Sequence, residues 1–306
     1  MTLTPTSTPS PTSFSINPWV DIQRIFQFAF MQHAFEAGTI VAIIAGIVGY
    51  FVVLRRSSFA AHALSHIGFS GAAAAVLVGV SPVYGLLLFT TVGGLGIAAL
   101  GKRAANRDTE IGIVLAFTLG LGVLFLSLYA GYAEEAYSIL FGEILGVSFS
   151  NVLLTLGAGV IVLVLMAAVY RPLLFASLDE DVAEAKGMPV VLLGIIFMLL
   201  VAVATSFAVQ VVGVLLIFSL MVTPAATAQL LAKRPRRVII ISVTIALIAT
   251  WLGLFIAFYE PYPVSFFITS IVFVFYLFVR FITPRIRNFM TGFRKSTIKP
   301  DLILPQ

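Results

Sequence analysis

Long apolar stretches separated by short polar junctions dominate this chain. Those long enough to cross a hydrocarbon core of about 30 Å as helices number nine. They run from about 28 to 54, 59 to 79, 83 to 100, 109 to 130, 149 to 170, 189 to 208, 211 to 232, 238 to 258 and 263 to 282. The pattern predicts an all-α integral membrane protein, a bundle of about nine transmembrane helices.

One segment breaks this pattern. The stretch from Glu134 to Ser148 is too short and too charged to be a span of its own. Irregular backbone at membrane depth is tolerated only where it is buried in protein or lines water. We therefore predict a short re-entrant or surface helix there.

Composition supports a membrane protein and divides the chain into three parts. Only 10% of the residues are charged, against about 25% in a soluble domain, and the mean hydropathy is +1.10. The first residues are rich in Thr, Ser and Pro and lack the basic start of a signal peptide. We expect an external disordered tail over 1–27, a transmembrane domain over 28–282 and a cytoplasmic basic tail over 283–306. The absence of cysteine excludes disulfides and thiolate ligands.

The positions of the basic residues predict the orientation. If the Arg55-Arg56 junction is cytoplasmic, alternation of the spans places nearly every other basic residue on the same side, leaving Arg24 alone among 18 outside. This predicts an external N-terminus and a cytoplasmic C-terminus. The net charge of +5 is then a topology signal, and no nucleic-acid partner is expected.

Two of the three histidines, His62 and His66, stand one helical turn apart in the second apolar stretch. A helix brings positions i and i+4 to one face, so both imidazoles could bind one metal ion. A helix that starts near Ser58 would carry His66 about 12 Å into the membrane, where ionisable side chains usually mark a transport path. The alternative is a pair of neutral imidazoles hydrogen-bonded to carbonyls of neighbouring helices.

Two motifs that suggest enzymes fail on inspection. A zinc protease of the His-Glu-x-x-His type needs a general base where Ala63 stands. The stretch from Gly96 to Lys102 resembles a phosphate-binding loop, but Arg103 replaces the hydroxyl residue that holds Mg²⁺, and no strand precedes it.

Other polar residues within the apolar stretches could line a path. Glu36, Glu143 and Thr223 are candidates, as is Gln210. For each residue taken alone, a helix-capping or interfacial role is favoured over a role in the path.

A cytoplasmic docking element is predicted between the fifth and sixth spans. Acidic Asp179, Glu180 and Asp181 open a short amphipathic helix that Gly187 and Pro189 end. Such a helix beside the membrane can fit a groove on a soluble partner. A merely solvated connector is the alternative.

In this order, these residues resemble a permease subunit of the ABC transporter family that imports zinc, manganese or iron(II). The resemblance covers about residues 28–282. It rests on Arg55-Arg56 leading to Ala63-Leu64-Ser65-His66 and Gly71, on Phe141-Gly142 with Leu145-Gly146, on Leu178-Asp179 with Ala183 and Gly187, and on Val212-Gly213-Val214-Leu215-Leu216 running to Thr223-Pro224-Ala225-Ala226-Thr227-Ala228.

The resemblance implies partners and roles. Two copies of the permease would form the path in a bacterial cytoplasmic membrane, with a separate ATPase below and an external metal-binding protein above. The chain itself would be no enzyme and would hold no cofactor. Its metal path would include His66, and its coupling helix would comprise Leu178, Asp179, Glu180, Asp181, Ala183 and Gly187.

Departures from the family pattern bear on the metal. His62 stands where an Asp is common, Ser70 replaces a usual Pro, and Glu143 replaces a small polar residue. A pair of imidazoles suits Zn²⁺ better than Mn²⁺, so the sequence favours a zinc importer that works by alternating access. A manganese or iron(II) importer of the same family, or a secondary transporter or channel without an ATPase, is the alternative.

Overall fold

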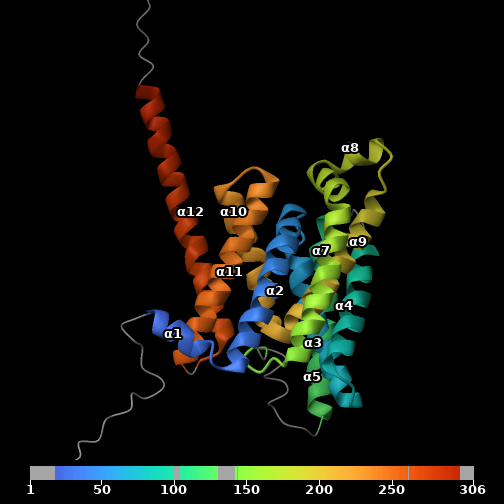
Figure 1. Ribbon diagram of the computed structural model, residues 1–306. Helices are drawn as coiled ribbons and strands as arrows, with labels where there is room; N and C mark the ends of the chain where they lie inside the picture. Colours follow the sequence, from blue (N-terminus) through green and yellow to red (C-terminus); the bar gives the residue numbers. More distant parts are fainter. Residues whose placement is uncertain (1–17, 100–103, 130–141, 143, 261, 297–306) are drawn as a thin grey trace, which may run out of the picture.

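The computed structural model of the 306-residue chain describes residues 18–99, 104–129, 142, 144–260 and 262–296. Within these residues all regular structure is helical (Figure 1). In chain order they are α1 (Pro18–Ile25), α2 (Ala29–Leu54), α3 (Ser58–Val78), α4 (Pro82–Ala99), α5 (Ala104–Leu128), α7 (Phe149–Leu178), α8 (Glu180–Ala185), α9 (Val190–Val212), α10 (Val214–Leu231), α11 (Pro235–Tyr259) and α12 (Val264–Ser296).

The predicted all-α membrane bundle is confirmed. In the described part of the chain, nine helices are long and apolar enough to cross a membrane, and they match the nine predicted stretches. Two run further than expected. Helix α7 continues through Pro172 to Leu178, because a proline removes only one backbone donor and the helix resumes after it. Helix α12 continues to Ser296 although its apolar span ends at Phe281.

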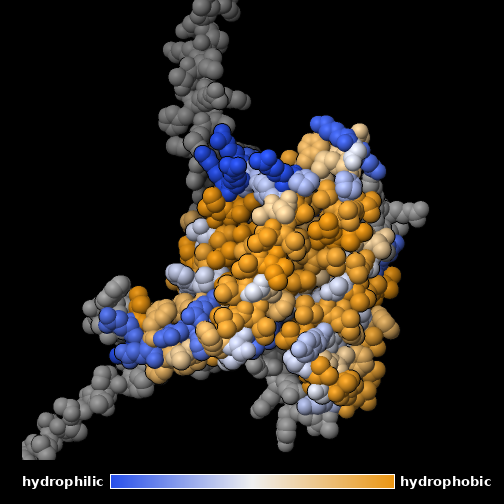
Figure 2. All heavy atoms as spheres, turned by 45° about the vertical axis from the view of Figure 1, so that its right-hand side comes forward, coloured by the Kyte–Doolittle hydropathy of each residue, from blue (hydrophilic) through white to orange (hydrophobic). Residues whose placement is uncertain are grey.

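The spanning helices divide into an inner and an outer group. In the most apolar window of α2 and of α3, 67% of the residues are buried, whereas in α5 the share is 11%. Figure 2 shows a continuous hydrophobic belt on the side of the molecule with hydrophilic residues at its ends. Because soluble surfaces rarely carry such a belt, it is the face that meets lipid.

Glycines allow the inner helices to approach closely. A methyl group on Gly71 of α3 would collide with the carbonyl oxygen of Gly85 on α4. A methyl group on Gly49 of α2 would likewise collide with the carbonyl oxygen of Met221 on α10. Close contacts between small residues are a principal source of packing energy in lipid.

The two ends of the bundle differ. Helix α8, the connection between α10 and α11, and the far end of α12 lie at one end, and α1 lies at the other (Figure 1). The residues of α1 fall in the segment expected to be a disordered tail. They form a helix because Ile25 is buried against Met31 and Tyr259.

Part of the predicted re-entrant segment is visible. Its residues 134–141 and Glu143 lie outside the described structure, whereas Ile144 and Val147 are buried in a turn before α7. Gly142, at a φ of 79°, packs against the backbone of Val212 and Gly213. With its own φ of 83°, Gly213 is the single residue between α9 and α10. This junction lies three residues beyond the one expected near Gln210.

Candidate functional site

The sharp turn between α2 and α3 positions the histidine pair. The backbone N–H of Ser57 donates to the carbonyl of Val52 at 2.8 Å, and Arg56 adopts a left-handed conformation with φ of 53°. Helix α3 begins at the next residue, Ser58. His62 and His66 therefore lie on one face of α3, one turn apart.

The two imidazoles contact each other. Their ring centroids are 4.6 Å apart at an interplanar angle of 75°. The Nδ1 atom of each ring is buried and has no hydrogen-bond partner among the described residues. A buried polar atom is normally paired, so two adjacent unpaired nitrogens are unusual. Hydrogen bonds to carbonyls of neighbouring helices, the alternative considered from the sequence, are thus not observed for these two Nδ1 atoms.

An aromatic side chain forms one wall of the pair. The Phe218 ring of α10 lies 4.7 Å from the His62 ring, centroid to centroid. Sequence analysis did not identify Phe218, because nothing along the chain links it to a histidine on another helix. Thr223 follows on the same helix, about 7.5 Å further along its axis, and is half-buried.

The described residues place no carboxylate and no third histidine with the pair. Among the described residues, no group of three or more His, Cys, Asp or Glu side chains could hold a metal ion. Glu143 lies outside the described residues. The structure therefore brings His62 and His66 together and adds no third ligand of those residue types from its described part.

Glu36 lies elsewhere. It lines a cavity between α1, α2 and α11 together with Phe35 and Trp251, and no residue of α3 lines that cavity. The placement of Glu36 separates it from the histidine pair.

Gln210 lines a second cavity at the end of the bundle opposite α8. This cavity has a volume of about 580 Å³, and Ser81, Tyr129 and Asn151 also line it. The Gln210 Oε1 atom is buried and has no hydrogen-bond partner in the part of the chain that the structure describes.

The predicted docking element is a helix. Asp179 caps α8 by accepting a hydrogen bond from the backbone N–H of Val182 at 3.0 Å. Ala183 is completely buried against the ends of α7 and α9. Gly187, at a φ of 77°, ends the segment as its sequence predicts.

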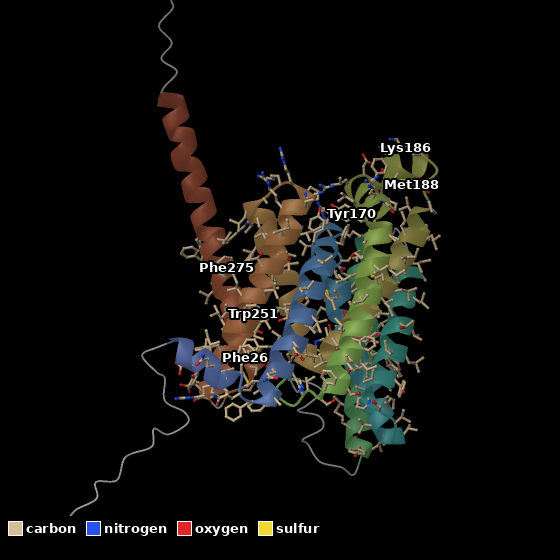
Figure 3. The ribbon with its side chains drawn as sticks, in the orientation of Figure 1. Phe26, Tyr170, Lys186, Met188, Trp251 and Phe275 are labelled. Atoms are coloured by element: carbon tan, nitrogen blue, oxygen red, sulfur yellow. The ribbon has the colours of Figure 1, made fainter. Side chains whose placement is uncertain are left out.

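The outward surface of this element is acidic and open. Glu180 and Asp181 are exposed, as is Leu178 at the end of α7. Lys186 makes a cation–π contact within the same chain, with its Nζ atom 4.9 Å from the centroid of the Phe175 ring on α7. Figure 3 shows Lys186 and Met188 at this end of the bundle.

Arg55 joins the docking element to the turn before the histidines. Its Nη1 atom donates to the Ser177 hydroxyl at 3.2 Å, and its guanidinium carbon lies 5.5 Å from the centroid of the Phe197 ring. Ser177 stands two residues before the Asp179 cap. Sequence analysis identified Arg55 as basic but missed this link, because 122 residues separate the partners.

Comparison with known proteins now decides the family. Residues 27–283 match the ABC 3 transport family, which is most of the chain. The chain belongs to the ABC 3 transport family. As an ABC 3 permease subunit it is a multi-pass protein of the bacterial cell membrane and a transport subunit rather than an enzyme.

Curated relatives of this ABC 3 permease are named for manganese. It is 33% identical over 268 residues to the "Manganese import system permease protein ScaB" of Streptococcus parasanguinis, covering 87% of this chain and 95% of the relative. It is 32% identical over 238 residues to the "Manganese transport system membrane protein MntC" of Listeria monocytogenes, covering 78% and 85%.

Solved structures share the fold. "PsaBC from Streptococcus pneumoniae in complex with Fab" contains a chain with a TM-score of 0.80 and 32% identity, covering 90% of this chain and 100% of that one. A putative metal-chelate type ABC transporter in an inward-facing conformation, 16% identical with a TM-score of 0.67, shares the fold alone.

Proposed function

We propose that this ABC 3 permease carries manganese into the cell as the membrane subunit of an ATP-driven importer. The names of its curated relatives support manganese. The preference for zinc drawn from the sequence finds no support among them. That preference rested on two ligands, and the ligands that complete a sphere decide the metal as much as the first two.

The histidine pair is the main reason for placing the path of the ion along α3. Two adjacent buried Nδ1 atoms without hydrogen-bond partners among the described residues are ready to accept a cation. In this proposal His62 and His66 bind the ion in transit. Thr223 and Glu143 stay candidate oxygen ligands for other points of the path, and Glu143 lies outside the described residues. The ion is the substrate, so a site that binds it only loosely would suit both capture and release.

The remaining ligands would come from a second copy of the chain. In a two-fold dimer each α3 would contribute its pair to one path at the interface. An external binding protein would deliver the ion at the end that carries α1. Oxygen atoms in the cavity around Gln210 could take up a hydrated ion there.

The ATPase would bind at the opposite end. The exposed side chains of Glu180 and Asp181 on α8 would enter a groove of the ATPase. The buried Ala183 would transmit movement of the ATPase to α7 and α9. ATP binding and hydrolysis would then alternate the opening of the path between the two sides.

Metal uptake into metal-depleted cells tests the proposal. The permease is expressed with its ATPase and binding protein, and uptake of manganese, zinc and iron(II) is compared. We expect manganese uptake that needs the ATPase. His66→Ala should lower it about ten- to a hundred-fold, while the amount of assembled complex stays the same.

Two variants sharpen this test. His33→Ala is the matched control, because His33 lies on α2 beside Phe149 and apart from the pair, and it should retain uptake. His62→Asp should retain uptake and increase the preference for manganese over zinc, because carboxylate suits Mn²⁺ better than imidazole does. Unchanged uptake in His66→Ala would remove the path assignment, and uptake without the ATPase would indicate a secondary transporter.

A further inference from the structure

A large apolar cavity lies at the end of the bundle that carries α1, away from the histidine pair. Its volume is about 840 Å³, within the range of small-molecule sites. Its walls come from three helices, α1, α2 and α11; Figure 3 shows Phe26 and Trp251 in this region. Besides Phe26 and Trp251, its lining includes Gln32, Glu36, Thr39, Ile40 and Leu252.

The lining changes from polar to apolar along one face of α2. Gln32, Glu36 and Ile40 follow one another at intervals of four residues, so they line the cavity on successive turns. The polar residues are nearer the start of the helix, at the membrane surface. A phospholipid has the same gradient from headgroup to acyl chain.

Packing and a hydrogen bond hold helix α1 and the turn after it against the rest of the protein. Ile25 is buried, and the Phe26 ring lies 5.1 Å from the Phe35 ring, centroid to centroid. The Gln32 Nε2 atom donates to the carbonyl of Phe26 at 2.7 Å, which fixes the turn into α2. Helix α1 precedes residue 27, where the family match begins.

The cavity opens toward the hydrocarbon. Trp251 and Leu252 on the spanning helix α11 are 50% and 47% exposed. The Trp251 Nε1 atom donates to the Thr39 hydroxyl at 2.9 Å, so the indole edge is satisfied and its ring is left for apolar contact.

Glu36 decides which headgroup fits. Its side chain is exposed and has no hydrogen-bond or ion-pair partner among the described residues. A carboxylate at this depth favours a cationic donor and repels an anionic headgroup. A quaternary choline group offers a charge but no N–H donor.

We propose that this cavity binds one phospholipid whose headgroup carries a primary ammonium group, as in phosphatidylethanolamine. The ammonium group donates to the Glu36 carboxylate, and an acyl chain lies between Ile40 and Trp251 beneath α1. The bound lipid joins α1 to α2 and α11. This site is independent of the transported metal.

Quenching of Trp251 fluorescence tests the proposal. The chain has two tryptophans, so Trp19→Phe leaves Trp251 as the only one. This variant, full-length, is reconstituted in phosphatidylcholine vesicles that contain a small fraction of lipid with brominated acyl chains. Brominated phosphatidylethanolamine should quench Trp251 more than brominated phosphatidylcholine or phosphatidylglycerol at the same fraction, and unbrominated phosphatidylethanolamine should reverse the excess.

A second substitution isolates the headgroup contact. Glu36→Gln should weaken binding of the brominated phosphatidylethanolamine about ten-fold, the value of one charge-assisted hydrogen bond. Glu260→Gln removes an exposed carboxylate that does not line the cavity and should leave binding unchanged.

Two outcomes would overturn the proposal. Equal quenching by all three headgroups, unaffected by Glu36→Gln, would mean ordinary contact with bulk lipid. Quenching by none of them would mean that protein, such as a second copy of the chain, covers the cavity. The measurement needs no transport, so its failure leaves the assignment of metal uptake untouched.

Discussion

The histidine pair and the α8 segment differ in how their polar groups are satisfied. At the pair, two buried Nδ1 atoms have no hydrogen-bond partner among the described residues. At α8, Asp179 caps the helix and Lys186 lies over Phe175, while Glu180 and Asp181 face outward. The first arrangement fits the proposed ion site, and the second fits the proposed contact with a protein partner.

A hydrogen bond also joins the two regions. Arg55 starts the turn that leads to the pair, and it donates to Ser177 in the last turn of α7, just before α8. One side chain thus connects the surface proposed for the ATPase to the helix proposed for the metal. We expect movement at α8 to reach α3 through the end of α7 and Arg55.

The largest effect on stability is expected where α3, the helix that carries the histidine pair, packs closely against α4. Gly71→Val places a side chain on the backbone of α4 at Gly85, and backbone cannot move aside. Overpacking of this kind destabilises by about 3 kcal/mol, so the yield of folded, monodisperse permease in detergent should fall sharply. Gly96→Val on α4 is the control, because a side chain there meets nothing within 4 Å. Equal yields of the two variants would show that the close approach of α3 and α4 is not needed.

The next effect concerns the acidic surface. Replacing Glu180 and Asp181 by lysine should weaken co-purification of the ATPase more than ten-fold. The new lysines would repel a basic groove that complements the native carboxylates, at a cost of about 2 kcal/mol. Asp179→Asn removes a charge but keeps a good helix cap, so it should retain most of the association. If the lysine variant binds the ATPase as the wild type does, α8 is a solvated connector and the contrast with the pair disappears.

A smaller effect tests the link between the regions. Arg55→Ala removes a charged donor from Ser177, so metal transported per ATP hydrolysed should fall about ten-fold, with the ATPase still bound. Exposed Arg56 is the neighbouring control, and Arg56→Ala should keep transport and hydrolysis coupled. Proportional loss of uptake and hydrolysis in Arg55→Ala would instead indicate a structural role for this side chain.

Much of the fold follows from the sequence, because a span must be a long apolar helix whatever surrounds it. The same holds for the end of the docking element, since Gly187 must take a conformation with positive φ. The extent of α7 and the helix at α1 do not follow from local pattern. Pro172 argues for an early end of α7, and α1 depends on Ile25 finding Met31 and Tyr259.

The candidate site divides in the same way. The sequence by itself determined that His62 and His66 share one face, because four residues make about one helical turn. Only the tertiary structure placed Phe218 against His62, set Glu36 apart in the cavity between α1, α2 and α11, and joined Arg55 to Ser177. Periodicity fixes neighbours along one helix, whereas contacts between helices depend on which faces pack, and glycines such as Gly71 and Gly49 decide that through close approach.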